Sequence, residues 1–342
     1  MNEKDYYYAV LKSSAMNIGE EIQSIAGFRF LPSVDKYVHK EKLSEYKSDK
    51  KTKLLMNGWY MWRPNFFPPS EDIEPLLISM YFNEDFRRKF NKKQKEYLIK
   101  YGPVGCRDKS TEKFLKEAGV PAYFSGCLTL TLEKNPEIKK KNYILAVNLA
   151  PHIIDLIKKR TNRPVYDISV LLLPNRTKER FDVAKTMLYL YQSAHCVVSS
   201  RLHVCLPCTA LQTPVLMLDA SNNVLHNDGR YEGLMDLCRV VKEDDFINGN
   251  YDFDFDNPPE NPNDYLKIRN DLIEKVSSFT GYNSNESNIP VLDDELLLNL
   301  ISAMRYNYIK LMKYVMYFLH KKDLLKTFIR KLFLIKTQHD IE

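Results

Sequence analysis

Short apolar runs alternate with amphipathic segments along most of this 342-residue chain, and this alternation constrains the fold more than any other feature. In the second half, apolar runs lie at residues 142–150, 166–174, 196–200 and 214–220, separated by helical patterns at 152–160, 177–194 and 201–212. Strands that alternate with helices are typical of parallel sheets covered by helices on both faces. The sequence therefore predicts an α/β fold.

The first half of the chain shows a similar series. We expect strands at residues 6–11, 103–108 and 121–126, a helix at 17–28, and one charged, exposed helix at 84–101. A further helix is expected between Asp108 and Gly119, because Asp is favoured at the N-terminal cap of a helix and Gly just after its last turn.

A break in the pattern separates the two series. The strand–helix alternation restarts after the lysine run at residues 139–141, which predicts two doubly wound domains, 1–138 and 139–282. A proline- and asparagine-rich linker at 256–264 precedes further helices, and residues 283–342 are expected to form a basic amphipathic helical extension.

Composition narrows the class of protein. The chain is 44% hydrophobic and 27% charged, which is typical of a globular protein rather than a disordered one. The N-terminus lacks the apolar core of a secretory signal, and no run of about eighteen apolar residues is present. The six cysteines have scattered spacings, which favours a reducing compartment. These features predict a cytoplasmic protein.

The net charge of +6 is confined to the C-terminal end. Residues 302–342 hold nine Lys or Arg and three acids, whereas the other 301 residues hold 41 bases and 41 acids. Bases interleaved with large apolar side chains are typical of helices that lie on an anionic membrane surface. Two interpretations stay open: the tail binds the inner face of the cell membrane, or it packs on the domains. The neutral remainder gives no indication of nucleic-acid binding.

The segment 199–208, SSRLHVCLPC, follows a predicted strand and begins a predicted helix. Ligands of parallel sheets bind at such junctions, where free backbone amides and the helix dipole attract anions. Arg201 would add a two-pronged donor, and His203 can exchange a proton near neutral pH. The alternative is that Arg201 pairs with a structural carboxylate and His203 fills a gap in the core.

Cys205 and Cys208 in the same segment have a C-x-x-C spacing. A structural zinc site needs four ligands, and the sequence has no second C-x-x-C or H-x-x-x-H. A redox pair is typical of a small thioredoxin-like unit, which this chain does not resemble. We expect both cysteines to be buried packing residues and predict no metal site.

Three other stretches carry residues suited to binding. Arg107 ends a predicted strand before a capped helix, where it either holds an anion or pairs with an acid. Asn17, Gly19 and Glu20 form a glycine turn between a strand and a helix, without the spacing of a dinucleotide fingerprint. The segment 226–234, HNDGRYEGL, offers His226, Asp228 and Arg230 as an acceptor loop or a plain turn.

Taken together, these stretches resemble the polysaccharide pyruvyl transferase family. NIGEEIQ at 17–23 is similar to the family's N-x-G-[DE]-E turn, and CRDKSTEKFLKEAG at 106–119 to its R-[DE]-x-x-S segment. SSRLHVCLPCTALQTPVL at 199–216 resembles its S-x-R-x-H signature. The resemblance covers about residues 5–240. Departures are Glu20, where aspartate is usual, and SGCLTLTL at 125–132 in place of a D-P-[ST] turn.

The resemblance implies two Rossmann-like domains facing a cleft, as in the two-domain (GT-B) glycosyltransferases. It implies transfer of pyruvate from phosphoenolpyruvate, as co-substrate, to a sugar diol of a surface polysaccharide or its lipid-linked precursor, without a cofactor. His203 is then expected to be the catalytic acid, acting as an imidazolium that protonates the enol carbon. Arg201, Arg107 and Ser200 would bind the donor, and Asn17, Gly19, Glu20 and Arg230 would contact the acceptor or shape its loops.

The sequence leaves two other functions open. A sugar-nucleotide-dependent glycosyltransferase of the same overall fold would need a glutamate that grips the nucleotide ribose late in the second domain, and no clear residue is found. A non-enzymatic, membrane-associated scaffold of a polysaccharide assembly machine would leave Arg201 and His203 dispensable.

Overall fold

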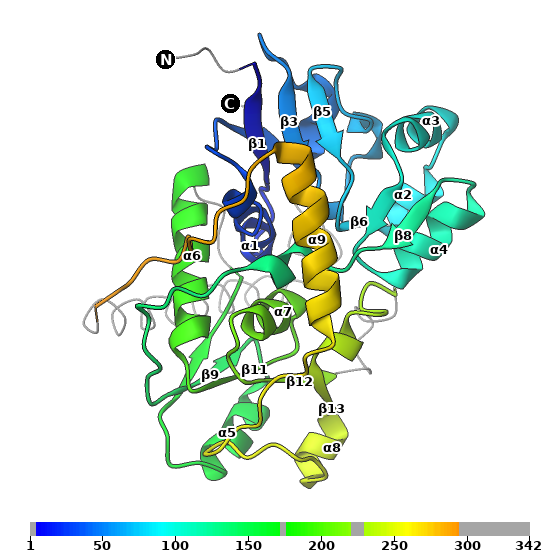
Figure 1. The fold of residues 1–342 in the computed structure, drawn as a ribbon. Helices are drawn as coiled ribbons and strands as arrows, with labels where there is room; N and C mark the ends of the chain where they lie inside the picture. Colours follow the sequence, from blue (N-terminus) through cyan, green and yellow to red (C-terminus); the bar gives the residue numbers. More distant parts are fainter. Residues whose placement is uncertain (1–4, 172–175, 220–228, 294–342) are drawn as a thin grey trace, which may run out of the picture.

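The computed structural model describes residues 5–171, 176–219 and 229–293 (Figure 1). The strands of these residues form three sheets, and every pairing between their strands is parallel. In the C-terminal half an α-helix lies between most successive strands, as the alternating pattern predicted, whereas in the N-terminal half β3 and β5 lead directly into the next strand. The α/β class is therefore confirmed.

The C-terminal sheet has five strands in the order β10 (Val165–Ile168), β9 (Ile144–Val147), β11 (Cys196–Ser199), β12 (Val215–Asp219) and β13 (Arg239–Lys242). Its side chains alternate between two cores. Ile144 and Ala146 pack with α5 (Pro151–Lys159) and α8 (Glu243–Asn248), whereas Leu145 and Val147 pack with α6 (Thr177–Ser193) and α7 (Leu202–Ala210). Both faces are buried, which explains the nearly continuous apolar runs.

The N-terminal half contains two sheets instead of the single one that a doubly wound domain predicts. One has the order β2 (Lys36–His39), β1 (Tyr7–Lys12), β3 (Thr52–Leu55), β5 (Ile73–Leu76); the other β4 (Gly58–Tyr60), β6 (Met80–Phe82), β7 (Val104–Cys106), β8 (Ala122–Phe124).

A bend in the backbone separates these two sheets. The chain passes from β5 to β6 through Ser79, whose φ of 52° is left-handed and interrupts the strand. Backbone bonds still cross the break, because the Met56 amide donates to Leu76 (3.0 Å) and the Gly58 amide to Ser79 (3.2 Å). The two sheets thus continue one another across a bend.

The single helix expected at residues 84–101 is also wrong in detail, because it consists of α2 (Glu84–Arg88) and α3 (Lys92–Tyr101). The first helix ends at Arg88, and Asn91 is the N-cap of the second. Its side chain accepts from the Gln94 amide, and the Gln94 side chain accepts from the Asn91 amide, both at 3.1 Å. This reciprocal capping box favours a new helix start over a continuous helix.

The expected capping of α4 (Lys109–Glu117) is confirmed. The Asp108 carboxylate accepts from the Thr111 amide at 2.8 Å, and Gly119 closes the helix with a φ of 73°. The N-terminal helix α1 (Gly19–Ile25) is shorter than the predicted 17–28 and is followed by a 3-10 turn, η1 (Phe28–Phe30). Further 3-10 turns are η2 (Lys40–Glu45), η3 (Pro64–Phe66), η4 (Leu128–Thr131) and η6 (Met235–Leu237).

Helices also connect the two halves of the chain. Helix α1 packs on α6, and α9 (Tyr265–Thr280) runs from the C-terminal sheet back to the ends of β1 and β3 (Figure 1). There the Lys53 ammonium donates to the Phe279 carbonyl at 2.9 Å. The predicted boundary at 138/139 falls between η4 and β9, in a segment without helix or strand.

The predicted helical extension is only partly within the described residues. Residues 283–293 are not helical, and residues 294–342 lie outside the described part. Of the helices described, none is long and apolar enough to cross a membrane.

Candidate active site

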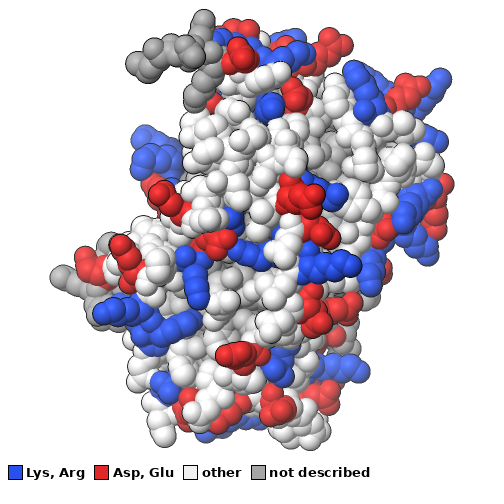
Figure 2. Space-filling model, in the orientation of Figure 1, with Lys and Arg blue, Asp and Glu red and all other residues white. Residues whose placement is uncertain are grey.

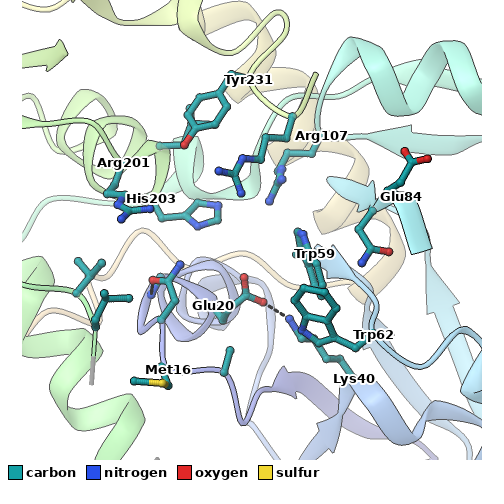
Figure 3. Close-up of a pocket in the computed structure, with 18 of the residues that line it drawn as sticks. Met16, Glu20, Lys40, Trp59, Trp62, Glu84, Arg107, Arg201, His203 and Tyr231 are labelled. Atoms are coloured by element: carbon teal, nitrogen blue, oxygen red, sulfur yellow. Dashed lines mark hydrogen bonds and ion pairs between the residues drawn. The ribbon is translucent and has the colours of Figure 1, made fainter. Parts of the chain in front are cut away.

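A cavity of about 420 Å³ lies where loops from both halves of the chain meet (Figure 3). One side is formed by the N-terminus of α7 and the loop after β7, which carry His203, Arg201 and Arg107. The other side is formed by the start of α1, by η2, and by β4 with the segment after it, which carry Glu20, Lys40, Trp59 and Trp62. The ends of parallel strands are the usual place for ligand sites in such folds.

The turn from β11 into α7 is fixed by Ser199. Its hydroxyl donates to the Val147 carbonyl at 2.9 Å and accepts from the Arg201 amide at 3.1 Å. Arg201 has an extended backbone and occupies the position before the helix, so the first amides of α7 lie at the cavity. The helix dipole and these amides favour an anion at this point.

His203 lies on the first turn of α7 and points into the cavity. Its Nε2 atom is buried and has no hydrogen-bond partner among the described residues. Burial lowers the pKa of His203 well below its usual value, and the charges of Arg107, Arg230 and Lys40 lower it further. These surroundings favour the neutral imidazole in the protein on its own, so the expected imidazolium would need additional negative charge close to His203.

Gly19 allows α1 to approach His203 closely. A Cβ atom added at Gly19 would lie 2.9 Å from His203 Cβ and 3.1 Å from His203 Nδ1. The Gly19 amide donates to the Asn17 side-chain oxygen at 2.9 Å, and the Ile18 amide to the Val170 carbonyl at 3.0 Å. The N-x-G turn thus joins the two sides of the site, and any larger residue at Gly19 would push them apart.

Arg107 is only 3% exposed and is held in place by two contacts. Its Nη1 donates to the Gln23 side-chain oxygen at 3.4 Å, and its guanidinium lies 4.8 Å from the centroid of the Tyr81 ring. Its Nε atom is buried with no acceptor among the described residues. Arg230 also lines the cavity, with its guanidinium 5.1 Å from the centroid of the Tyr231 ring.

The opposite side of the cavity combines an ion pair with aromatic rings. The Lys40 ammonium, 2% exposed, pairs with the Glu20 carboxylate. It also lies 5.0 Å from the centroid of the Trp59 ring, and the Trp59 and Trp62 rings are 4.5 Å apart at an angle of 51°. Figure 3 shows both indoles on the side of Lys40, across the cavity from His203.

The structure brings most of the predicted site residues together. The residues that line the cavity are Asn17, Gly19, Glu20, Arg107, Arg201, His203 and Arg230. Ser200 does not line it and is half-buried in the turn before α7. His226 and Asp228 lie outside the described residues.

The cavity is also lined by five residues that no sequence motif had indicated: Lys40, Trp59, Trp62, Glu84 and Asp85. One signal was available for the tryptophans: they are the only two in the chain and lie three residues apart, in GWYMWRP. No signal was available for Lys40, because its position depends on contacts with α1.

The cysteines are packing residues, as expected. All six are buried and unbonded to one another, and burial raises the pKa of the Cys205 and Cys208 thiols. The described residues contain no group of three His, Cys, Asp or Glu side chains placed to hold a metal ion.

The arrangement has a distinct chemistry on each side. Arg107, Arg201, Arg230 and a helix N-terminus suit a small ligand with more than one anionic group. A buried imidazole beside them can transfer a proton. The side formed by the indoles and carboxylates suits an uncharged polar ligand.

Comparisons with known proteins point to one family. A family model described as polysaccharide pyruvyl transferase matches residues 17–222. No curated protein has a detectably similar sequence.

Three solved structures share a distant likeness. An uncharacterised protein of Klebsiella pneumoniae is 13% identical over 66% of this chain and 87% of its own, with a TM-score of 0.45. The UDP-GlcNAc 2-epimerase of Methanocaldococcus jannaschii is 9% identical over 88% and 99%, with a TM-score of 0.34. MnaA of S. aureus, bound to UDP, is 10% identical over 90% and 98%, with a TM-score of 0.37. Sequence identities and TM-scores this low allow no conclusion about the function of this chain from the three structures.

Proposed function

The chain belongs to the polysaccharide pyruvyl transferase family, and from this membership we propose that it transfers pyruvate from phosphoenolpyruvate to two hydroxyls of a sugar, forming a cyclic ketal. The acceptor is a surface polysaccharide or its lipid-linked precursor. We also propose the arrangement of two Rossmann-like domains around the cavity, with the donor on the C-terminal side and the acceptor on the N-terminal side.

The observation that carries this proposal is the convergence of Arg107, Arg201 and Arg230 on His203 in one cavity. Phosphoenolpyruvate has a carboxylate and a phosphate, so several arginines and a helix N-terminus match its charges. The guanidinium groups would also stabilise the phosphate as it leaves.

The reaction balances without an oxidant, a reductant or a cofactor. A proton adds to C3 of the enol, which becomes a methyl group, and the first sugar oxygen bonds to C2. The C2–O bond to phosphate then breaks, and the second sugar oxygen bonds to C2. The two sugar hydroxyls each lose a proton. One of these protons replaces the one that the acid gave to C3, and the other leaves on the phosphate.

His203 is proposed as the acid for C3 and Glu20 as the base for a sugar hydroxyl. His203 is neutral when only the protein's own charges surround it, because burial and the cations lower its pKa. The negative charges of the donor would offset Arg107 and Arg230 and raise the pKa of His203 again. Donor binding would thus create the acid that the first step needs.

Donor binding is the first test. Phosphoenolpyruvate should raise the melting temperature of the protein, because a ligand that binds the native state stabilises it. UDP- and GDP-sugars should do so much less. Stabilisation by a sugar nucleotide and none by phosphoenolpyruvate would favour the glycosyltransferase instead.

Turnover is the second test. Protein supplied with phosphoenolpyruvate and a panel of lipid-linked sugars should release phosphate only when an acceptor is present. Phosphate release that ignores every acceptor would contradict ketal formation.

A further inference from the structure

We propose that Trp59 and Trp62 form the platform on which the acceptor sugar ring binds, with an uncharged hexopyranose as the occupant. This inference rests on the proposed function and deepens it. It assigns the acceptor subsite to residues that no sequence motif marks.

The two indoles have the geometry of a binding surface. Trp59 is in β4, Trp62 follows it before η3, and both rings are half-buried and line the cavity. Their centroids are 4.5 Å apart and their planes meet at 51°, so they form a bent aromatic wall. The apolar C–H face of a pyranose packs against the electron-rich face of an indole.

Buried charged groups hold this wall in position. Glu41, 5% exposed, accepts from the Trp62 amide at 3.2 Å and from the Arg63 amide at 2.8 Å, one bond to each carboxylate oxygen. Its neighbour Lys40 lies over the Trp59 ring and pairs with Glu20. A wall fixed in this way before the ligand arrives loses little conformational entropy on binding.

The charges around the wall fit a neutral polyol and not a second anion. Glu20, Glu84 and Asp85 line the cavity on this side, and their carboxylates can accept hydrogen bonds from hydroxyl groups. The cations here are compensated, because Lys40 pairs with Glu20 and Arg88 with Asp85. The arginines near His203 would attract the anionic donor, so the two ligands are sorted by charge.

The position of Glu20 links the wall to the chemistry. Figure 3 draws its carboxylate between the indoles and His203. A sugar ring stacked on the indoles would present hydroxyls on one edge toward Glu20 and the bound donor. The wall thus holds the diol, and Glu20 accepts a proton from it.

Tryptophan fluorescence gives a direct test, because Trp59 and Trp62 are the only tryptophans in the chain. Full-length protein saturated with phosphoenolpyruvate is titrated with the methyl glycosides of galactose, glucose, mannose, N-acetylglucosamine and N-acetylmannosamine. We expect a saturable change in tryptophan emission with at least one glycoside. Calorimetry of the same mixtures measures binding independently.

Variants show whether the indole makes the contact. Trp62→Ala should weaken binding of that glycoside about tenfold, and the matched Trp62→Phe, which keeps an aromatic face, by about threefold or less. Trp59→Phe leaves Trp62 as a single reporter and should retain the change in emission. These conservative variants keep the test valid if Trp62→Ala does not fold.

Two results would overturn the platform: no glycoside changes the emission, or a glycoside binds by calorimetry equally well to wild-type protein and to the Trp62 variants. The donor reports separately on the proposed function. A phosphoenolpyruvate-induced rise in melting temperature with unresponsive tryptophans rejects the platform alone, whereas the absence of that rise rejects the donor assignment.

Discussion

His203 is surrounded by cations, and this environment determines how the site can start an acid-catalysed reaction. Arg107, Arg230 and Lys40 all lower its pKa in addition to burial. Two of these cations, Arg107 and Arg230, are also proposed to bind the anionic donor. A donor bound to these two arginines would offset their effect on the pKa of His203, so binding and proton uptake should be linked.

This linkage can be measured. Binding of phosphoenolpyruvate should take up to about one proton onto His203, so affinity should increase as pH falls toward the pKa of the complex. Calorimetry in two buffers of different ionisation enthalpy gives the number of protons. The donor phosphate, with a second pKa of about 6, also takes up protons, and His203→Gln serves as the control that isolates it. Equal proton uptake by wild-type protein and His203→Gln would contradict the linkage.

His39 gives a second pH dependence, on stability. Burial and the nearby lysines lower its pKa to about 4, and its Nδ1 accepts from the Glu41 amide at 3.1 Å, which requires the neutral ring. Because the folded pKa is below the unfolded value, this contribution is present above about pH 6.5 and is lost as pH falls toward 4.

We expect a loss on the order of 1 kcal/mol in the free energy of unfolding between pH 7 and pH 5 from this histidine. Urea unfolding at the two pH values measures it. His39→Asn, which can cap the same amide without titrating, should show a smaller loss. The same pH dependence in the variant would show that His39 is not the cause.

A substitution at Gly19 tests the close contact between α1 and His203, which joins the two sides of the site. Gly19→Ala should abolish most of the donor-induced rise in melting temperature, because its Cβ would lie 2.9 Å from His203 Cβ. Gly249→Ala is a matched control, since no atom lies within 4 Å of a Cβ there and only its left-handed backbone is strained. The control should lower stability by about 1 kcal/mol and keep the donor response. An unchanged response in Gly19→Ala would show that the contact does not matter.

At the scale of elements, the packing of α1 on α6 positions the N-x-G turn. Glu21 and Arg180, 1% and 4% exposed, form a buried two-pronged ion pair at 2.8 Å. The Arg180 guanidinium also donates at 2.6 Å to the carbonyl of Ala15, which lines the cavity. This ion pair therefore connects the core of the second half to the entry of α1.

Removal of one partner should be costly. Glu21→Ala should reduce the free energy of unfolding by about 3 kcal/mol, because Arg180 would stay buried without its counter-charge. Urea denaturation measures the loss. The double variant Glu21→Leu with Arg180→Met removes both charges and should recover much of it. A loss as large in the double variant as in Glu21→Ala would show that the packing of these side chains, and not the charge, is decisive.

The elements also show what the sequence could predict. Apolar runs such as that of β9 and the cap at Asp108 are local signals, and they indicated the α/β fold and several element ends correctly. The bend at Ser79 depends on contacts between distant strands.

In the site, Arg201 and His203 could be placed by their strand–helix junction. Lys40 and the orientation of Trp59 depend on the approach of α1 and η2, which one sequence does not reveal.

At the scale of the whole molecule, α9 and the residues that follow it contact the first half of the chain before the basic C-terminal segment begins. Helix α9 ends beside β1 and β3, and Arg29 of the first half donates to Asn283 at 3.2 Å. The chain is therefore packed into the fold up to at least residue 283. On the face of the molecule drawn in Figure 2, the basic and acidic side chains of the described residues are interspersed. The surplus of positive charge, in contrast, lies entirely after residue 301.

The location of this charge predicts binding to anionic membranes. Attraction to an anionic leaflet is worth about 1 kcal/mol for each basic residue near the surface and is screened by salt. With nine bases and three acids after residue 301, the protein should co-sediment with anionic vesicles at low salt and be released at high salt. Neutral vesicles are the control.

Deletion of residues 323–342 should reduce this binding in part, because that segment holds four of the nine bases but also all three acids of the tail. It should leave the phosphoenolpyruvate-induced rise in melting temperature unchanged, because none of the residues that line the cavity lie in it. If the shortened protein unfolds or aggregates, the segment packs on the fold and the membrane assignment is wrong. Full-length protein that ignores anionic vesicles at low salt would reject it directly. Retention at high salt would instead indicate that the apolar side chains, and not the charges, dominate the binding.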